Sequence, residues 1–235
     1  MEEQQLRILE QLLSKSSTKQ QVWKDAQWVF GILKEQAADL AAVLNYKVSD
    51  VDARVVVRYT EKGEHEFRLQ FSGDVLVFHL HTNAYALPEQ HEFRKSSYLR
   101  DDPMRAYFGI INIYNFLNDS LRYNRQGDIG QLVGRIYINK ERHFFVDGQR
   151  QLAFLYRDLA HQVIQEENYE DYYKLRKVVK TAMEYALAFD LQLPSMQESR
   201  EITVFQMENI SNELRVRKPA ALGFKTKSML NRKVL

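Results

Sequence analysis

The hydrophobic positions of residues 1–45 recur at the spacing of an α-helix. Leu6, Leu9, Leu12 and Leu13 form a first apolar series, and a longer series follows the polar stretch SKSSTKQQ. The second series contains Val22, Trp23, Ala26, Val29, Phe30, Leu33, Ala37, Leu40, Ala41 and Leu44. Because residues three and four apart share a helix face, we expect helix here, with a division in two at Ser16 to Thr18.

The period changes to two after residue 52, which predicts three antiparallel strands over 52–81. A three-residue loop, Glu61-Lys62-Gly63, unites the apolar positions of the first two strands on one face. The next turn, Ser72-Gly73, then places Phe67 opposite Phe78 and Leu69 opposite Leu76. On the other face this register predicts a ladder of Arg58, Glu66 and His79, with Glu64 opposite His81.

A segment of some twenty residues, 82–103, reads as a long loop or as a region with an extra short element. Asp102-Pro103 then forms a favourable helix start, with Asp at the N-cap and Pro in the first turn. The following stretch, 104–122, is apolar over most of its circumference, which is typical of a helix buried on more than one side. We expect this helix to form the seam of a homodimer through Ile110, Ile113, Leu117 and Leu121.

The segments QLVGRIYIN and RHFFVDG predict a second hairpin, joined at residues 139–141. Residues 149–190 have helical spacing again, with a break at Asn168. The fold class is therefore α+β, with an antiparallel sheet in the order α-β-β-β-α-β-β-α and helices packed on one face. The predicted division is an N-terminal helical arm (1–20), a single domain (21–193) and a C-terminal extension with a basic tail (194–235).

This element order resembles the type III secretion chaperone-like fold, which secretion chaperones share with a bacterial family of sensory transduction regulators. The likeness covers about residues 20–190 and includes the segment YNRQGDIGQLVGRIYINKERHFFVDG, in which a polar turn leads into a hairpin. The resemblance implies a homodimer that binds segments of other proteins and catalyses no reaction. The loop at 82–103 and the chain after residue 190 depart from the family's pattern.

The amino-acid composition excludes several kinds of site and segment. The chain contains no cysteine, so disulfides, thiol catalysis and thiolate metal sites are excluded. The first 30 residues lack the basic region followed by an apolar region that a secretion signal has, because Glu2, Glu3 and Glu10 interrupt them. No run of apolar residues approaches the ~18 residues of a membrane span. We therefore expect a cytoplasmic protein without a membrane span, and no cofactor is predicted.

The basic residues are concentrated at the C-terminal end. Residues 215–235 contain seven basic residues and no acidic one, which leaves 26 basic against 31 acidic residues in the preceding part of the chain. The seven are Arg215, Arg217, Lys218, Lys225, Lys227, Arg232 and Lys233. This tail could bind nucleic acid, and its interleaved Phe224 suits a segment that orders on a protein partner.

Two further sets of side chains suggest binding or chemistry. Tyr169, Tyr172, Tyr173 and Arg176 are residue types that anchor protein interfaces, although a partly buried helix face with exposed hydroxyls is the favoured explanation. His79 and His81 share one strand face beside Glu66, which is a conceivable zinc set. The alternative is a solvated charge ladder, and this interpretation is favoured.

These observations favour a non-enzymatic, homodimeric protein that binds another macromolecule, most simply another protein. One alternative is a nucleic-acid- or ribosome-associated protein that acts through residues 215–235. A second alternative is a metal-dependent enzyme at His79 and His81.

Overall fold

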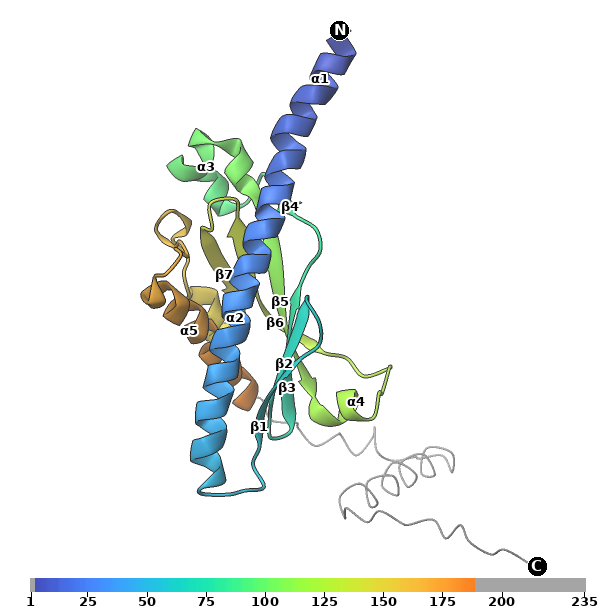
Figure 1. Cartoon of the computed structure of the whole chain (residues 1–235), viewed down its shortest axis with the longest axis vertical. Coiled ribbons are helices and arrows are strands. Elements are labelled where there is room, and N and C mark those ends of the chain that lie inside the picture. The colour runs from blue at the N-terminus through green and yellow to red at the C-terminus, as the bar shows by residue number, and fades with distance from the viewer. Residues whose placement is uncertain (1–2, 189–235) are drawn as a thin grey trace, which may run out of the picture. The chain divides into compact units, whose positions relative to one another are not determined.

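One long helix occupies the N-terminal segment of the computed structural model, which describes residues 3–188 (Figure 1). It consists of α1 (Glu3–Gln11), the π-helical turn η1 (Leu12–Ser16) and α2 (Ser17–Ser49). The predicted division near Ser16 is therefore a local widening of a continuous helix. In this turn the Ser14 hydroxyl donates a hydrogen bond of 2.6 Å to the Glu10 carbonyl, which competes with the regular helical bonding.

Within the described residues, seven antiparallel strands form one sheet. Its main path has the order β1-β2-β3-β5-β6-β7, and the two-residue strand β4 pairs with β5. The bounds are β1 (Val57–Glu61), β2 (Glu66–Phe71), β3 (Asp74–Leu80), β4 (Tyr85–Ala86), β5 (Tyr107–Leu117), β6 (Gln131–Asn139) and β7 (Phe144–Gly148). The predicted α+β class with an antiparallel sheet is confirmed, as are the meander and the second hairpin.

The register of the meander is partly as expected. Phe67 pairs with Phe78, Leu69 with Leu76, and Glu66 with His79. Between β1 and β2 the prediction was wrong by four residues, because Arg58 lies opposite Gln70 and the turn contains residues 63–65. Glu64 lies in that turn, so the predicted pairing of Glu64 with His81 does not form. A shift of four is even and keeps every side chain on its predicted face.

The main core lies between the sheet and two helices, α2 and α5 (Tyr169–Leu187), which pack on the same face of the sheet (Figure 1). Phe30 and Leu33 of α2 are fully buried against Phe67 and Phe78 of the meander, and the Phe67 and Phe78 rings stack at 4.5 Å. Helix α5 adds Leu175 and Val179 to this core. The helices therefore leave the opposite face of the sheet uncovered along β1 and β2, where the polar residues of the alternation lie.

The predicted helix over 104–122 is wrong. After the one-turn 3-10 helix η3 (Pro103–Ala106), which Asp102 caps as predicted, the chain forms the eleven-residue strand β5. Strand β5 lies between β3 and β6, and side chains on both of its faces are wholly or partly buried. A strand with both faces covered has an almost continuous apolar sequence, as a buried helix has, so the pattern alone does not separate the two.

Residues 82–106 contain several short elements instead of one open loop. These are β4, the 3-10 helix η2 (Glu92–Lys95), α3 (Ser97–Asp101) and η3, and they surround a second, smaller apolar cluster. Polar contacts attach this segment to the β6–β7 turn. The Tyr98 hydroxyl donates to Glu141 at 2.9 Å, Asn139 donates to the same hydroxyl at 2.9 Å, and Arg105 pairs with Glu141 at 2.9 Å.

The expected helix over 149–190 forms only in its second half. Residues 149–168 contain the short 3-10 helices η4 (Arg150–Phe154) and η5 (Leu159–His161), and Arg150 and Tyr156 have positive φ angles that a continuing helix does not allow. Asn168 is the N-cap of α5, and its side chain accepts a hydrogen bond from the Glu170 amide at 3.1 Å. The predicted break at Asn168 is therefore the start of the helix.

The predicted C-terminal extension and its basic tail lie outside the described residues, as does the ambiguous segment 200–212. Within residues 3–188, no helix combines the length and the apolar character needed to cross a membrane.

Candidate functional site

The uncovered face of the meander has a regular row of polar side chains. Arg58 and Thr60 of β1 alternate with core residues, and Arg68 and Gln70 of β2 do the same. The register places Arg58 directly opposite Gln70 and Thr60 directly opposite Arg68. Because side chains in a strand alternate between faces, these four side chains project together from the side of the sheet away from α2.

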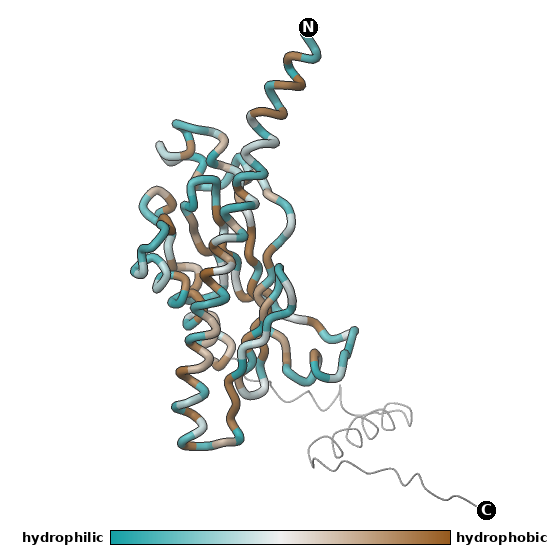
Figure 2. Tube along the Cα trace, in the orientation of Figure 1, coloured by the Kyte–Doolittle hydropathy of each residue, from teal (hydrophilic) through white to brown (hydrophobic). Residues whose placement is uncertain are grey.

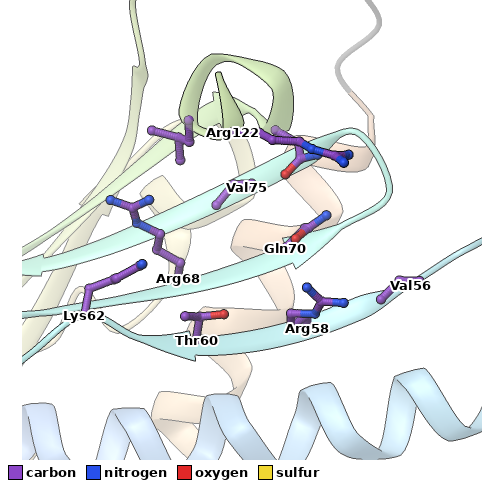
Figure 3. Close-up of a pocket in the computed structure, with 10 residues that line it drawn as sticks. Val56, Arg58, Thr60, Lys62, Arg68, Gln70, Val75 and Arg122 are labelled. Carbon is purple, nitrogen blue, oxygen red and sulfur yellow. The ribbon is translucent and has the colours of Figure 1, made fainter. Parts of the chain in front are cut away.

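A hollow of about 490 Å³ opens on this face (Figure 3). Its walls come from β1, β2, β3 and the short helix α4 (Asn118–Arg122). The lining residues are Val56, Arg58, Thr60, Lys62, Arg68, Gln70, Val75, Asn118, Leu121 and Arg122. Three aliphatic side chains and three uncharged polar ones therefore accompany four cations.

Helix α4 closes one end of the hollow because the chain is anchored on both sides of it. The Asn118 amide donates to the Gly73 carbonyl at 2.7 Å, which fixes the end of β5 to the β2–β3 turn. The Ser120 hydroxyl is buried and donates to Asp128 at 2.6 Å. These bonds hold Leu121 and Arg122 beside strands that lie far from them in the sequence.

The charge of the hollow is positive and only partly neutralised. None of its ten lining residues is acidic. Arg68 pairs with Glu66 at 2.7 Å, and the Arg122 guanidinium lies 5.6 Å from the centroid of the Tyr123 ring. Arg58 and Lys62 form no ion pair within residues 3–188. Several cations around one concave surface attract anions and bind carboxylates or phosphates through charge-assisted hydrogen bonds.

The lining residues are of types that bind anions. The hollow has no carboxylate or imidazole for proton transfer and no nucleophile paired with a base. It also has no aromatic residue, whereas surfaces that bind single-stranded nucleic acid stack the bases on aromatic rings. Its three aliphatic residues, Val56, Val75 and Leu121, offer apolar contact beside the cations.

The set of His79, His81 and Glu66 is not a metal site in the structure. Glu66 pairs with Arg68, and His81 lies beyond the end of β3. The two ring nitrogens of His81 are engaged, Nδ1 by the Asn83 amide at 3.1 Å and Nε2 by the Tyr85 hydroxyl at 2.8 Å. Within the described part of the chain, no three His, Asp or Glu side chains are arranged to hold a metal ion.

The tyrosine set of α5 divides between surface and core. Tyr169 and Tyr173 are exposed, whereas Tyr172 is half-buried and packs edge-on against Trp28 with 6.5 Å between ring centroids. The Tyr172 hydroxyl also accepts a hydrogen bond from the Glu167 amide at 3.1 Å. Tyr172 therefore fixes the start of α5, and only Tyr169, Tyr173 and the half-buried Arg176 remain as surface groups for a partner.

The proposed seam residues do not form one helical stripe. Ile113 is fully buried in the main core, Ile110 lies on the other face of β5, and Leu117 is 38% exposed at the strand's end. Leu121 lies on α4, where it lines the hollow. The tail residues Arg215, Arg217, Lys218, Phe224, Lys225 and Lys227 lie outside the described residues.

Comparison with known proteins gives no relative for this chain: no protein-family model, curated protein or solved structure matches it. The resemblance to the secretion chaperone-like fold therefore stays a prediction. The predicted element order on which the resemblance rests differs from the observed order at one place, because residues 104–122 contain strand β5 where a helix was expected.

Sequence reasoning found the polar face but missed the hollow. The alternation of Arg58, Thr60 and Lys62 was the available signal, since three polar side chains recur with period two. The predicted register placed Arg58 opposite Glu66, which would neutralise the arginine. In the structure Arg58 lies opposite Gln70, and its charge is left unpaired within residues 3–188. The contribution of Leu121 and Arg122 had no signal, because these residues were assigned to a long helix.

Proposed function

We propose that this protein is a non-enzymatic, cytoplasmic binding protein that holds an acidic segment of another protein in the basic hollow. The observation that carries the proposal is the cluster of four cations around a concave surface whose lining contains no acid. An acidic segment would pair its carboxylates with Arg58, Lys62 and Arg122, while its aliphatic side chains contact Val75 and Leu121.

A protein segment fits this surface better than nucleic acid does. Phosphates would satisfy the cations equally well, but the hollow offers aliphatic contact and no stacking platform. The tail remains a separate candidate for nucleic acid, so its effect is tested independently by deletion of residues 215–235.

The test is the affinity of the full chain for a labelled, short poly-glutamate peptide, measured by fluorescence anisotropy. A peptide of equal length with glutamine in place of glutamate measures the contribution of charge. We expect binding of the glutamate peptide only, with an affinity that falls as salt rises from about 50 mM to about 500 mM, because exposed charges are screened over a short distance in salt.

Two variants locate the binding site. Arg58→Glu and Arg122→Glu should each weaken binding about tenfold, a loss typical of a removed charged contact. Lys180→Glu is the control. Lys180 is exposed on α5, away from the hollow, and its substitution changes the net charge by the same amount. Equal losses in all three variants would show a general charge effect and contradict the proposal. If an oligonucleotide bound more tightly than the peptide and the same two substitutions abolished this binding, the ligand of the hollow would be nucleic acid. This result would contradict the proposal of a protein segment.

A further inference from the structure

A second cavity, of about 570 Å³, lies between the first turns of α2 and the segment 82–85, which follows β3 (Figure 1). Helix α2 contributes Lys19, Gln20 and Trp23 to its lining, and the segment contributes four residues that end with Tyr85. Figure 2 shows hydrophilic residues at this part of α2. Pockets that hold small molecules have volumes of roughly 300–1,000 Å³. The cavity is therefore large enough for a small-molecule ligand.

Two aromatic rings border this cavity, and a histidine fixes each of them. The Trp23 indole stacks on the His65 imidazole with 5.4 Å between ring centroids and 25° between ring planes. The Tyr85 hydroxyl lies 2.8 Å from His81 Nε2, and the two rings meet edge-on with 4.9 Å between centroids. Neither histidine lines the cavity, so both support their partners from outside it. A stacking surface that is fixed before binding loses little entropy when a flat ligand binds.

The cavity also has one unpaired positive charge. Lys19 is half-buried, and its Nζ lies 5.8 Å from the centroid of the Tyr107 ring. Lys19 forms no ion pair within residues 3–188, and none of the seven lining residues is acidic. The side-chain amides of Gln20 and Asn83 make no hydrogen bond to another described residue. The lining therefore offers a stacking surface, one cation and free amide groups.

We propose that this cavity binds a free nucleoside monophosphate, with its base stacked on the Trp23 indole and its phosphate paired with Lys19. Aromatic side chains stack on nucleobases of every type, because each base has a π face. A lysine ammonium binds phosphate as a point charge. The amides of Gln20 and Asn83 then bind the polar edge of the base or the hydroxyls of the sugar.

A nucleoside monophosphate is the ligand that uses the whole lining. An aliphatic anion would pair with Lys19 and leave the two rings without a stacking partner, and an uncharged aromatic molecule would leave Lys19 unpaired. A diphosphate or triphosphate carries more charge than one lysine neutralises, which favours the monophosphate. The basic hollow, by contrast, has four cations and no aromatic ring. The two sites share no residue, so this inference does not rest on the proposed function.

The first test is quenching of tryptophan fluorescence by AMP in the full chain. The chain has only two tryptophans, so Trp28→Phe leaves Trp23 as the sole emitter. We expect saturable quenching with a dissociation constant below about 1 mM, and at least about tenfold weaker binding of adenosine, which lacks the phosphate. Calorimetry repeats the titration on the unsubstituted chain, so the result does not depend on the folding of the variant. Absence of saturable binding with both AMP and UMP would overturn the proposal.

The second test separates the two contacts of the ligand. Lys19→Gln should weaken AMP binding at least about fivefold and leave adenosine binding unchanged, whereas Tyr85→Ala should weaken both, because it removes a ring. Lys24→Gln is the matched control, since Lys24 is exposed on α2 and does not line the cavity. Equal effects of the two lysine substitutions would overturn the phosphate contact. Binding of a 5′-phosphorylated hexanucleotide more than about tenfold tighter than AMP would identify a nucleic-acid strand as the ligand and overturn the free mononucleotide.

Discussion

Asp25 of α2 and Arg142 of the β6–β7 turn form an ion pair between residues 117 positions apart in the sequence. Arg142 Nε lies 3.0 Å from Asp25 Oδ1, and the Asp25 side chain is only 3% exposed. The Arg142 guanidinium also lies 4.4 Å from the centroid of the Trp28 ring and pairs with Glu166 at 2.7 Å. One arginine thus connects the long helix, the second hairpin and the segment before α5.

Removal of the Asp25 carboxylate should be costly because Arg142 would lose its buried partner. We expect Asp25→Ala to lower the free energy of unfolding by about 3 kcal/mol, the loss typical of a broken buried ion pair. Glu166→Ala is the matched control, since Glu166 pairs with the same arginine but is 64% exposed, and we expect it to cost at most about 0.5 kcal/mol. Urea denaturation measures both. Equal losses would contradict the claim that burial makes the Asp25 contact the stronger one.

Asp102 makes the free energy of unfolding depend on pH in the acid range. The hydrogen bond from Lys140, at 2.5 Å, holds the pKa of Asp102 below its ordinary value; burial acts in the opposite direction, and the Met104 amide adds to the lowering. Because the pKa is lower in the folded than in the unfolded state, the ionised carboxylate stabilises the fold at neutral pH. This contribution is lost as the pH falls through the folded-state pKa.

Asp102→Asn removes the charge but keeps the N-cap of η3, because an asparagine oxygen can still accept the Met104 hydrogen bond. The variant therefore measures the effect of the charge alone. We expect a loss of about 0.5 kcal/mol at pH 7, kept small by the partial exposure of both partners. Asp102→Ala should cost about 1 kcal/mol more, since it also removes the cap. In urea titrations the asparagine variant and the parent should converge as the pH falls through the lowered pKa of Asp102. A constant difference at all pH values would refute the electrostatic explanation.

Asp74 at the start of β3 is a site where loss of charge should stabilise the protein. Burial raises the pKa of Asp74, and the hydrogen bond from Asn115 opposes that rise. The Asn115 Oδ1 atom is itself buried without a partner in the described structure. Asp74→Asn removes a poorly solvated charge and provides an N–H donor for this oxygen.

We therefore expect Asp74→Asn to raise the free energy of unfolding at pH 7 by about 0.5 kcal/mol, the scale of one additional hydrogen bond. Because the pKa is raised in the folded state, the gain should decrease as the pH falls through that pKa and the parent carboxylate becomes neutral. The comparison is made by urea denaturation at neutral and acid pH. A destabilised variant at pH 7 would contradict the prediction.

The assignment of residues 107–117 to a strand is tested by two aliphatic substitutions. Ile113 is fully buried in β5, whereas Leu117, four residues on, is 38% exposed. Ile113→Ala should cost about 3 kcal/mol, and Leu117→Ala less than about 1 kcal/mol. A helix would place both residues on one stripe, so similar losses in urea denaturation would favour the helix that the sequence suggested.

The regions with a clear period of two could be predicted from sequence. In β2 and β3, apolar and polar residues alternate, and the pairs Phe67–Phe78 and Leu69–Leu76 follow from the turn at Ser72-Gly73. Strand β5 could not be identified in this way, because side chains on both of its faces are wholly or partly buried and its sequence is therefore almost continuously apolar. Its length of eleven residues also removed the usual distinction between short strands and long helices.

Contacts between distant residues account for the other differences. The short helices of residues 82–106 depend on Tyr98 and Arg105, whose partners Asn139 and Glu141 are about forty positions away. The segment 149–168 has helical spacing, but the positive φ angles of Arg150 and Tyr156 interrupt it. The hollow likewise requires α4 to reach the meander through the Asn118–Gly73 bond, for which local sequence has no signal.

We propose that the basic hollow between β1, β2, β3 and α4 binds an acidic protein segment. Hydrogen–deuterium exchange of the full chain, with and without a saturating amount of the poly-glutamate peptide, is the decisive experiment because it locates the contact. We predict slower exchange in peptic fragments covering residues 56–77 and 118–122, with no change in fragments of α5, and loss of this protection in Arg58→Glu. Protection confined to α5, to residues 215–235 or to no fragment at all would contradict it.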